Sequence, residues 1–139
     1  MTETFPPRTS IFKTIGFWIA ALMAVLQALN AIRAFAAPVG FSEYMGLPLQ
    51  NAMDVGFVYV YGLRAAFISL LVILFLAVRR FDALAWTAAA ALLMPVGDAL
   101  LAQNAGAPLV TVLRHAAIAV YVFIAFFVLR HTAASDMER

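Results

Sequence analysis

A carboxylate, a guanidinium and an imidazole lie inside long apolar segments of this sequence, at Asp98, Arg64 and His115. An ionisable side chain in such a segment is costly to keep there and points to a functional site. Within one site, Asp98 and His115 would exchange a proton, while Arg64 would hold an oxyanion or a carboxylate. These three side chains are the predicted catalytic residues.

Further polar residues are predicted to bind a substrate at the same site: Asn30, Arg33, Tyr61 and Arg114. Tyr61 lies on the same side of its helix as Arg64. Arg114 is rotated by about 100° from His115, so it is expected to face another interface or to extend outward. The simpler alternative for the central charges is a structural Arg64–Asp98 ion pair that fixes the register of the helices.

The residue types exclude several kinds of cofactor. The chain has no cysteine, which excludes disulfides and thiolate metal sites. The second histidine, His131, lies in the C-terminal tail, so no metal site is predicted. No cofactor is predicted; axial ligation of haem by His115 is the one option considered, and no specific feature supports it. The basic residues form no continuous face, so nucleic acid is not a predicted partner.

The elements that position these residues are membrane helices. Of the residues, 65% are hydrophobic and 12% are charged, and the mean hydropathy is +0.97. A soluble domain of this length needs more polar surface. Four apolar runs are long enough to cross a bilayer, at about residues 11–37, 56–78, 83–102 and 109–129. They define a membrane domain over residues 11–131, between tails at 1–10 and 132–139.

Short connections make consecutive helices neighbours, so the predicted fold is all-α, an antiparallel four-helix transmembrane bundle. Its orientation follows from the lysine and arginine residues. Connections 38–55 and 103–108 contain none, whereas the other side of the membrane receives six: Arg8, Lys13, Arg79, Arg80, Arg130 and Arg139. The positive-inside rule therefore predicts a multi-pass protein of the cell membrane with both termini in the cytoplasm.

Two segments are predicted to interrupt the helices near the site. The connection 38–55 contains two glycines and two prolines, which are expected to prevent a helix. It would either fold over the bundle as a lid or lie on the membrane surface, and both alternatives stay open. Pro95 and Gly97 directly precede Asp98 and are predicted to bend the third helix beside it.

Several short motifs resemble those of a known family. Gly62 and Arg64 form a Gly-x-Arg motif, Gly97-Asp98 a Gly-Asp motif, and His115 opens the fourth helix. In this order they are similar to small four-helix membrane proteins of unknown function related to the DoxX-like group. The resemblance covers about residues 15–130, and Ala65 stands where the family has an aspartate. It implies the four-helix fold and the same polar site.

The sequence supports three hypotheses of function. In the first, the Arg/Asp/His site in the outer half of the bundle binds a small lipophilic or anionic molecule. It would transform that molecule by acid–base chemistry of the isomerase, cyclase or hydrolase type. In the second, the chain is an accessory or structural subunit of a membrane redox complex, as the resemblance implies. In the third, it is a homodimeric transporter. The predicted partners are the lipid bilayer, the small ligand and a second copy of the chain.

Overall fold

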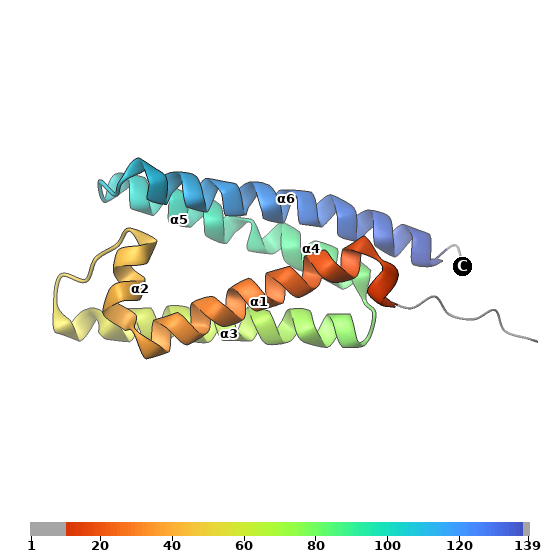
Figure 1. Cartoon of the computed structure of the whole chain (residues 1–139), viewed down its shortest axis with the longest axis horizontal. Coiled ribbons are helices and arrows are strands. Elements are labelled where there is room, and N and C mark those ends of the chain that lie inside the picture. The colour runs from red at the N-terminus through yellow and green to blue at the C-terminus, as the bar shows by residue number, and fades with distance from the viewer. Residues whose placement is uncertain (1–10, 138–139) are drawn as a thin grey trace, which may run out of the picture.

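The computed structural model describes residues 11–137, and every regular element within them is a helix (Figure 1). Arg8 and Arg139, which the predicted orientation also uses, lie outside the described residues. Four helical segments are long and apolar enough to span a membrane: Ile15–Ala36, Val55–Ala77, Phe81–Asn104 and Leu109–Asp136. The predicted number of apolar spans is therefore confirmed. Large apolar side chains such as Phe67 and Leu93 are exposed on these helices, as expected for surfaces that face lipid.

The first half of the chain contains a spanning pair and a short helix between its members. After a 3-10 turn (η1, Ile11–Lys13), α1 runs over Ile15–Ala36, and the hydroxyl of Thr14 caps its start by accepting from the Phe17 amide. α2 (Pro38–Met45) follows directly, and a second turn (η2, Ala52–Asp54) leads into α3 (Val55–Ala77). α1 and α3 make the most extensive contact in the molecule. Ser69 joins them by donating to the Ala24 carbonyl at 2.9 Å.

The second half contains the other pair. α4 (Phe81–Ala91) and α5 (Leu93–Asn104) together form the third span, and both pack along α6 (Leu109–Met137). α6 also contacts α1, where the Tyr121 hydroxyl donates to the Ile19 carbonyl at 2.7 Å. Figure 1 shows the two pairs side by side, with the described start and end of the chain at the same end of the bundle.

The break in the third span has a local cause. Pro95 has no amide hydrogen, so the Ala91 carbonyl four residues earlier has no helical donor, and the proline ring crowds it. Helix α4 ends at Ala91 and α5 begins at Leu93. The Leu92 amide still donates to Ala88 at 3.1 Å and the Val96 amide to Leu92 at 3.4 Å, so the two helices stay connected. The predicted interruption is present, one turn before Pro95.

The prediction that 38–55 contains no helix is wrong. Pro38 occupies the first turn of α2, where its missing amide hydrogen removes no helical bond. Gly46 ends the helix in the left-handed conformation, at φ +80°, which suits a glycine at this position. Figure 1 places α2 between the α1/α3 pair and the α5/α6 pair, at the end of the bundle far from the described termini. The same two residue types that suggested a loop therefore begin and end a short helix.

Close packing of α1 against α6 supplies a stability prediction. A Cβ on Gly16 would lie 2.5 Å from Thr132 Oγ1 and 2.9 Å from Thr132 Cβ. We expect Gly16→Ala to lower the free energy of unfolding by about 1–3 kcal/mol because of this overlap. Gly56→Ala is the matched control, since a Cβ on Gly56 meets no atom within 4 Å.

Thermal unfolding in detergent measures both variants. Adding Thr132→Ala to Gly16→Ala is expected to recover part of the lost stability, because it removes the overlapping Oγ1 and Cγ2 atoms but keeps Cβ, whereas Thr132→Gly should recover more because it removes Cβ as well. Equal effects of the Gly16 and Gly56 substitutions would contradict a close contact between α1 and α6 at this position.

Candidate functional site

A small cavity, here called the polar pocket, lies where α2 meets the two helix pairs. Its volume is about 40 Å³. Every long helical segment contributes to it, and so does α2. The lining residues are Gln27 and Asn30 of α1, Tyr44 and Met45 of α2, Tyr61 of α3, Met94, Pro95 and Asp98 of α5, and Arg114, His115 and Ile118 of α6.

Two side chains of α6 hold the end of α2. His115 is buried, and its Nε2 lies 3.1 Å from the Met45 carbonyl oxygen. Arg114 donates from Nη2 to the Tyr44 carbonyl. The last carbonyls of a helix have no partner within the helix, and cationic donors near them are favourable. Arg114 and His115 therefore fix the C-terminal end of α2 over the pocket.

The hydrogen bond to the Met45 carbonyl also determines that Nε2 of the His115 ring carries a proton. A carbonyl oxygen only accepts, so Nε2 must be the nitrogen that donates. In the neutral imidazole, Nδ1 is then unprotonated and can accept a proton. The ring is thus oriented by α2.

Two arginine side chains lie over the ring of Tyr44, which lines the pocket. The guanidinium carbon of Arg114 lies 3.6 Å from the centroid of this ring. The guanidinium carbon of Arg33 lies 5.3 Å from the same centroid. Both distances are within the range of a cation–π interaction. Tyr44 thus brings two cations from opposite halves of the chain to one side of the pocket.

Two polar groups of the pocket lack a protein partner. The half-buried Asp98 carboxylate accepts no hydrogen bond and forms no ion pair within residues 11–137. Arg114 Nε is buried and has no hydrogen-bond partner in the described part of the chain. Buried polar groups are bonded in the great majority of cases, so the unpartnered Arg114 Nε calls for an explanation. Here both belong to one cavity.

The structure places the predicted site residues in two groups. Asn30, Tyr61, Asp98, Arg114 and His115 line the polar pocket. Arg33 is exposed, and its guanidinium lies over the Tyr44 ring.

Arg64 is exposed and does not line the pocket, and the Arg64–Asp98 ion pair is not formed among the described residues. Arg64 is three residues after Tyr61, which turns it by about 60° away from the side that Tyr61 presents to the pocket.

The expected separation of Arg114 from His115 is wrong, because both line the same cavity. A long guanidinium side chain reaches round its helix, and α2 supplies the carbonyl toward which it turns. Gln27 and Tyr44 were absent from the predicted site. Gln27 had a detectable signal, as an amide in the middle of an apolar segment, whereas nothing in the sequence indicated Tyr44.

Three features of the structure define the class of protein: four helices of membrane-spanning length, a short helix between the two pairs, and a polar pocket beneath that helix. The chain has the features of a small multi-pass helical membrane protein. Residues 14–129 match the family model described as domain of unknown function (DUF4267), and the chain belongs to this family. No curated protein and no solved structure matches the chain. The family match covers nearly the same residues as the resemblance and gives no link to the DoxX-like group.

Proposed function

We propose that the polar pocket binds the anionic head group of a small amphiphilic molecule. The observation that carries this proposal is the half-buried Arg114 side chain, which lines the pocket with a buried, unpartnered Nε. A guanidinium is the side chain best suited to bind a carboxylate or a phosphate through parallel hydrogen bonds. Arg114 takes the role of anion binding that the sequence suggested for Arg64.

The size of the pocket limits the ligand. A volume of about 40 Å³ exceeds the roughly 10–15 Å³ that a cavity needs in order to hold one water molecule. Sites for whole drug-sized molecules measure about 300–1,000 Å³. The pocket thus accommodates a polar head group only. An apolar remainder would lie along the lipid-facing helix surfaces, which makes an amphiphile with one charged end the fitting ligand class.

The balance of charge favours an anion. Arg114 lines the pocket and Arg33 lies beside it, against the single carboxylate of Asp98. Asp98 and the free Nδ1 of His115 are the groups that would transfer protons to or from a bound molecule. Arg114 would meanwhile stabilise negative charge on it. Acid–base conversion of the ligand, as in an isomerase, cyclase or hydrolase, is the reaction class that these groups serve.

The pocket is proposed to open toward the outer side of the membrane. The bundle is then antiparallel with both termini in the cytoplasm, because Lys13, Arg79, Arg80 and Arg130 precede or follow spans at the end far from α2. Helix α2 would act as the lid, since Tyr44 and Met45 close the pocket from that side. No specific observation favours the accessory-subunit or transporter alternatives.

Binding of decanoate and of decanol tests the proposal, because the two molecules differ only in the charged end. Calorimetric titration of the full chain in detergent is expected to show tighter binding of decanoate. Arg114→Gln should weaken decanoate binding by about 10- to 100-fold, the range for loss of a charge-assisted hydrogen bond. Decanol binding should change by less than about twofold.

Two further variants keep the test decisive if Arg114→Gln folds poorly. Asp98→Asn removes the negative charge from the pocket and is expected to strengthen decanoate binding. Arg64→Gln is the matched control for a lost arginine, since Arg64 does not line the pocket, and should leave binding unchanged. Equal affinity for decanoate and decanol, or an equal loss in the Arg64 and Arg114 variants, would overturn the proposal.

A further inference from the structure

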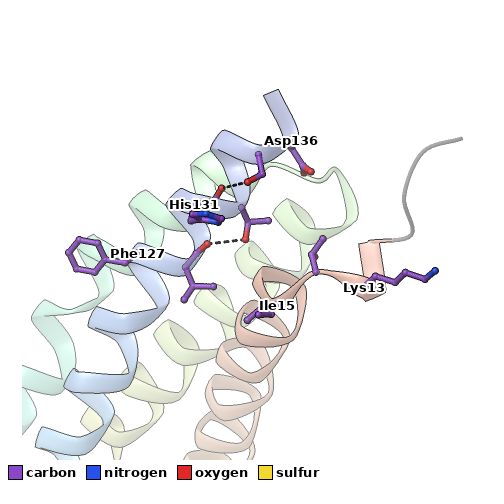
Figure 2. A pocket seen from close by; sticks show the side chains of 9 residues that line it. Lys13, Ile15, Phe127, His131 and Asp136 are labelled. Atoms are coloured by element: carbon purple, nitrogen blue, oxygen red, sulfur yellow. Dashed lines mark hydrogen bonds between the residues drawn. The ribbon is translucent and has the colours of Figure 1, made fainter. Parts of the chain in front are cut away.

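A second and larger cavity lies at the opposite end of the bundle, between the start of α1 and the end of α6 (Figure 2). This terminal groove has a volume of about 620 Å³, within the range of small-molecule sites. Its apolar part is formed by Ile15, Phe127 and Val128, and its charged rim by Lys13, His131 and Asp136. It shares no residue with the polar pocket.

The charged groups are the part of the groove left to bind a ligand. Three hydroxyls in its wall already donate to backbone carbonyls: Thr14 to Ile11, Thr132 to Val128 and Ser135 to His131. Figure 2 shows Lys13 and Asp136 on opposite rims, with the Lys13 side chain extending away from α6. Neither forms an ion pair among residues 11–137. The long lysine side chain rotates freely enough to bring its ammonium over the groove.

The position of the groove matches the head-group level of a bilayer. Trp18 and Trp86 are both exposed near this end of the bundle, and the Arg130 guanidinium lies 5.5 Å from the Trp86 ring. Tryptophan and basic residues concentrate where membrane helices leave the hydrocarbon. Helix α6 continues to Met137, beyond the predicted end of its span at residue 129. In a bilayer placed by these residues, the rim with Lys13, His131 and Asp136 would lie beside the lipid head groups, with Phe127 toward the acyl chains.

We propose that the terminal groove binds a phospholipid whose head group carries a phosphate and a primary amine. Lys13 and His131 would donate to the phosphate, and Asp136 would accept from the ammonium. Lys13 and Asp136 together complement the two charges of a zwitterionic head group. A head group that carries only a negative charge would be repelled by Asp136. A quaternary ammonium has no N–H to donate to Asp136. Ile15, Phe127 and Val128 would contact the first part of an acyl chain.

Native mass spectrometry of the full chain, titrated with three dioleoyl phospholipids in detergent, tests this assignment. Phosphatidylethanolamine is expected to bind about threefold more tightly than phosphatidylglycerol or phosphatidylcholine, as fits interactions of exposed charges. Asp136→Asn should reverse the order of the ethanolamine and glycerol lipids, because it removes the like charge. Lys13→Gln should weaken binding of both, by about threefold.

Arg79→Gln is the matched control, because Arg79 is exposed and does not line the groove, so the order of the three lipids should stay as in the natural sequence. Glycerophosphoethanolamine carries the same charges without acyl chains and should not displace the bound lipid. Equal affinity for the three lipids, or an unchanged lipid order in Asp136→Asn, would overturn the proposal. Displacement by glycerophosphoethanolamine would overturn the lipid as the ligand.

Discussion

Replacement of Gly46 by valine is expected to displace α2 from α6 and to lower the free energy of unfolding by about 2–5 kcal/mol. Two effects add at this position. Gly46 has φ +80°, a conformation that a β-branched residue adopts only at a high energetic cost. A Cβ there would also lie 2.9 Å from both Ala107 Cβ and Thr111 Cγ2. The packed neighbours leave no space into which the new side chain fits.

The same substitution is expected to disturb the polar pocket. Tyr44 and Met45 immediately precede Gly46, and their carbonyls are the hydrogen-bond partners of Arg114 and His115. Displacement of α2 would therefore release both side chains. Chemical unfolding measures the loss of stability, hydrogen exchange over residues 38–46 measures the release of α2, and decanoate titration measures the effect on the pocket.

Gly106→Val is the control that separates the two causes. Gly106 also has a positive φ, of +73°, but a Cβ there meets no atom within 4 Å. Its replacement should therefore cost only the backbone strain, about 1–2 kcal/mol, and should leave hydrogen exchange in α2 unchanged. Equal losses at Gly46 and Gly106 would contradict the close contact between the end of α2 and α6.

The second large effect is expected for Arg114→Met, which should lower the free energy of unfolding by about 3 kcal/mol. The substitution removes the donor to the Tyr44 carbonyl and the cation nearest its ring. It also leaves the Asp98 carboxylate in a pocket without an arginine. A partly buried carbonyl left without its donor costs about 1–3 kcal/mol, and the lost cation–π contact adds about 0.5–2 kcal/mol.

A double-mutant cycle isolates the interaction between the two charges. If Arg114 and Asp98 stabilise each other across the pocket, the double variant Arg114→Met/Asp98→Asn should be more stable than Arg114→Met alone. The expected coupling is about 1–2 kcal/mol, within the range for groups that share a cavity. Chemical unfolding in detergent measures all members of the cycle. Strict additivity would show that the two charges are independent, although they line one pocket.

The four apolar spans follow from local properties of the sequence. Each span is a continuous run of apolar side chains whose length matches the thickness of a bilayer. Such a run can be recognised from residues that are neighbours in the sequence. The break at Leu92 is local as well, because Pro95 removes one specific hydrogen bond. Helix α2 was missed although Pro38 and Gly46 occupy the positions that favour a helix start and a helix end. Those residues also occur in loops, and only the packing of Phe41 and Met45 against α1 and α3 selects the helix.

The composition of the polar pocket depends on contacts between helices that are far apart in the sequence. The sequence identified Asn30, Tyr61, Asp98 and His115 as candidate site residues, and these four side chains line one cavity in the structure. The positions of two residues on one helix give the angle between their side chains. They do not show which neighbouring helix either side chain faces. For that reason the exposed Arg64 was assigned to the centre of the site, and Arg114, although named as a substrate-binding residue, was expected to turn away from His115.

The sequence by itself determined the class of protein and the number of apolar spans, because hydrophobicity and helix length act through neighbouring residues. Only the tertiary structure decided which arginine lies at the pocket. Arg114 lies there because α2 folds back between the helix pairs and presents the Tyr44 and Met45 carbonyls to α6. Those carbonyls lack partners within their own short helix, and the nearest donors across the bundle are Arg114 and His115.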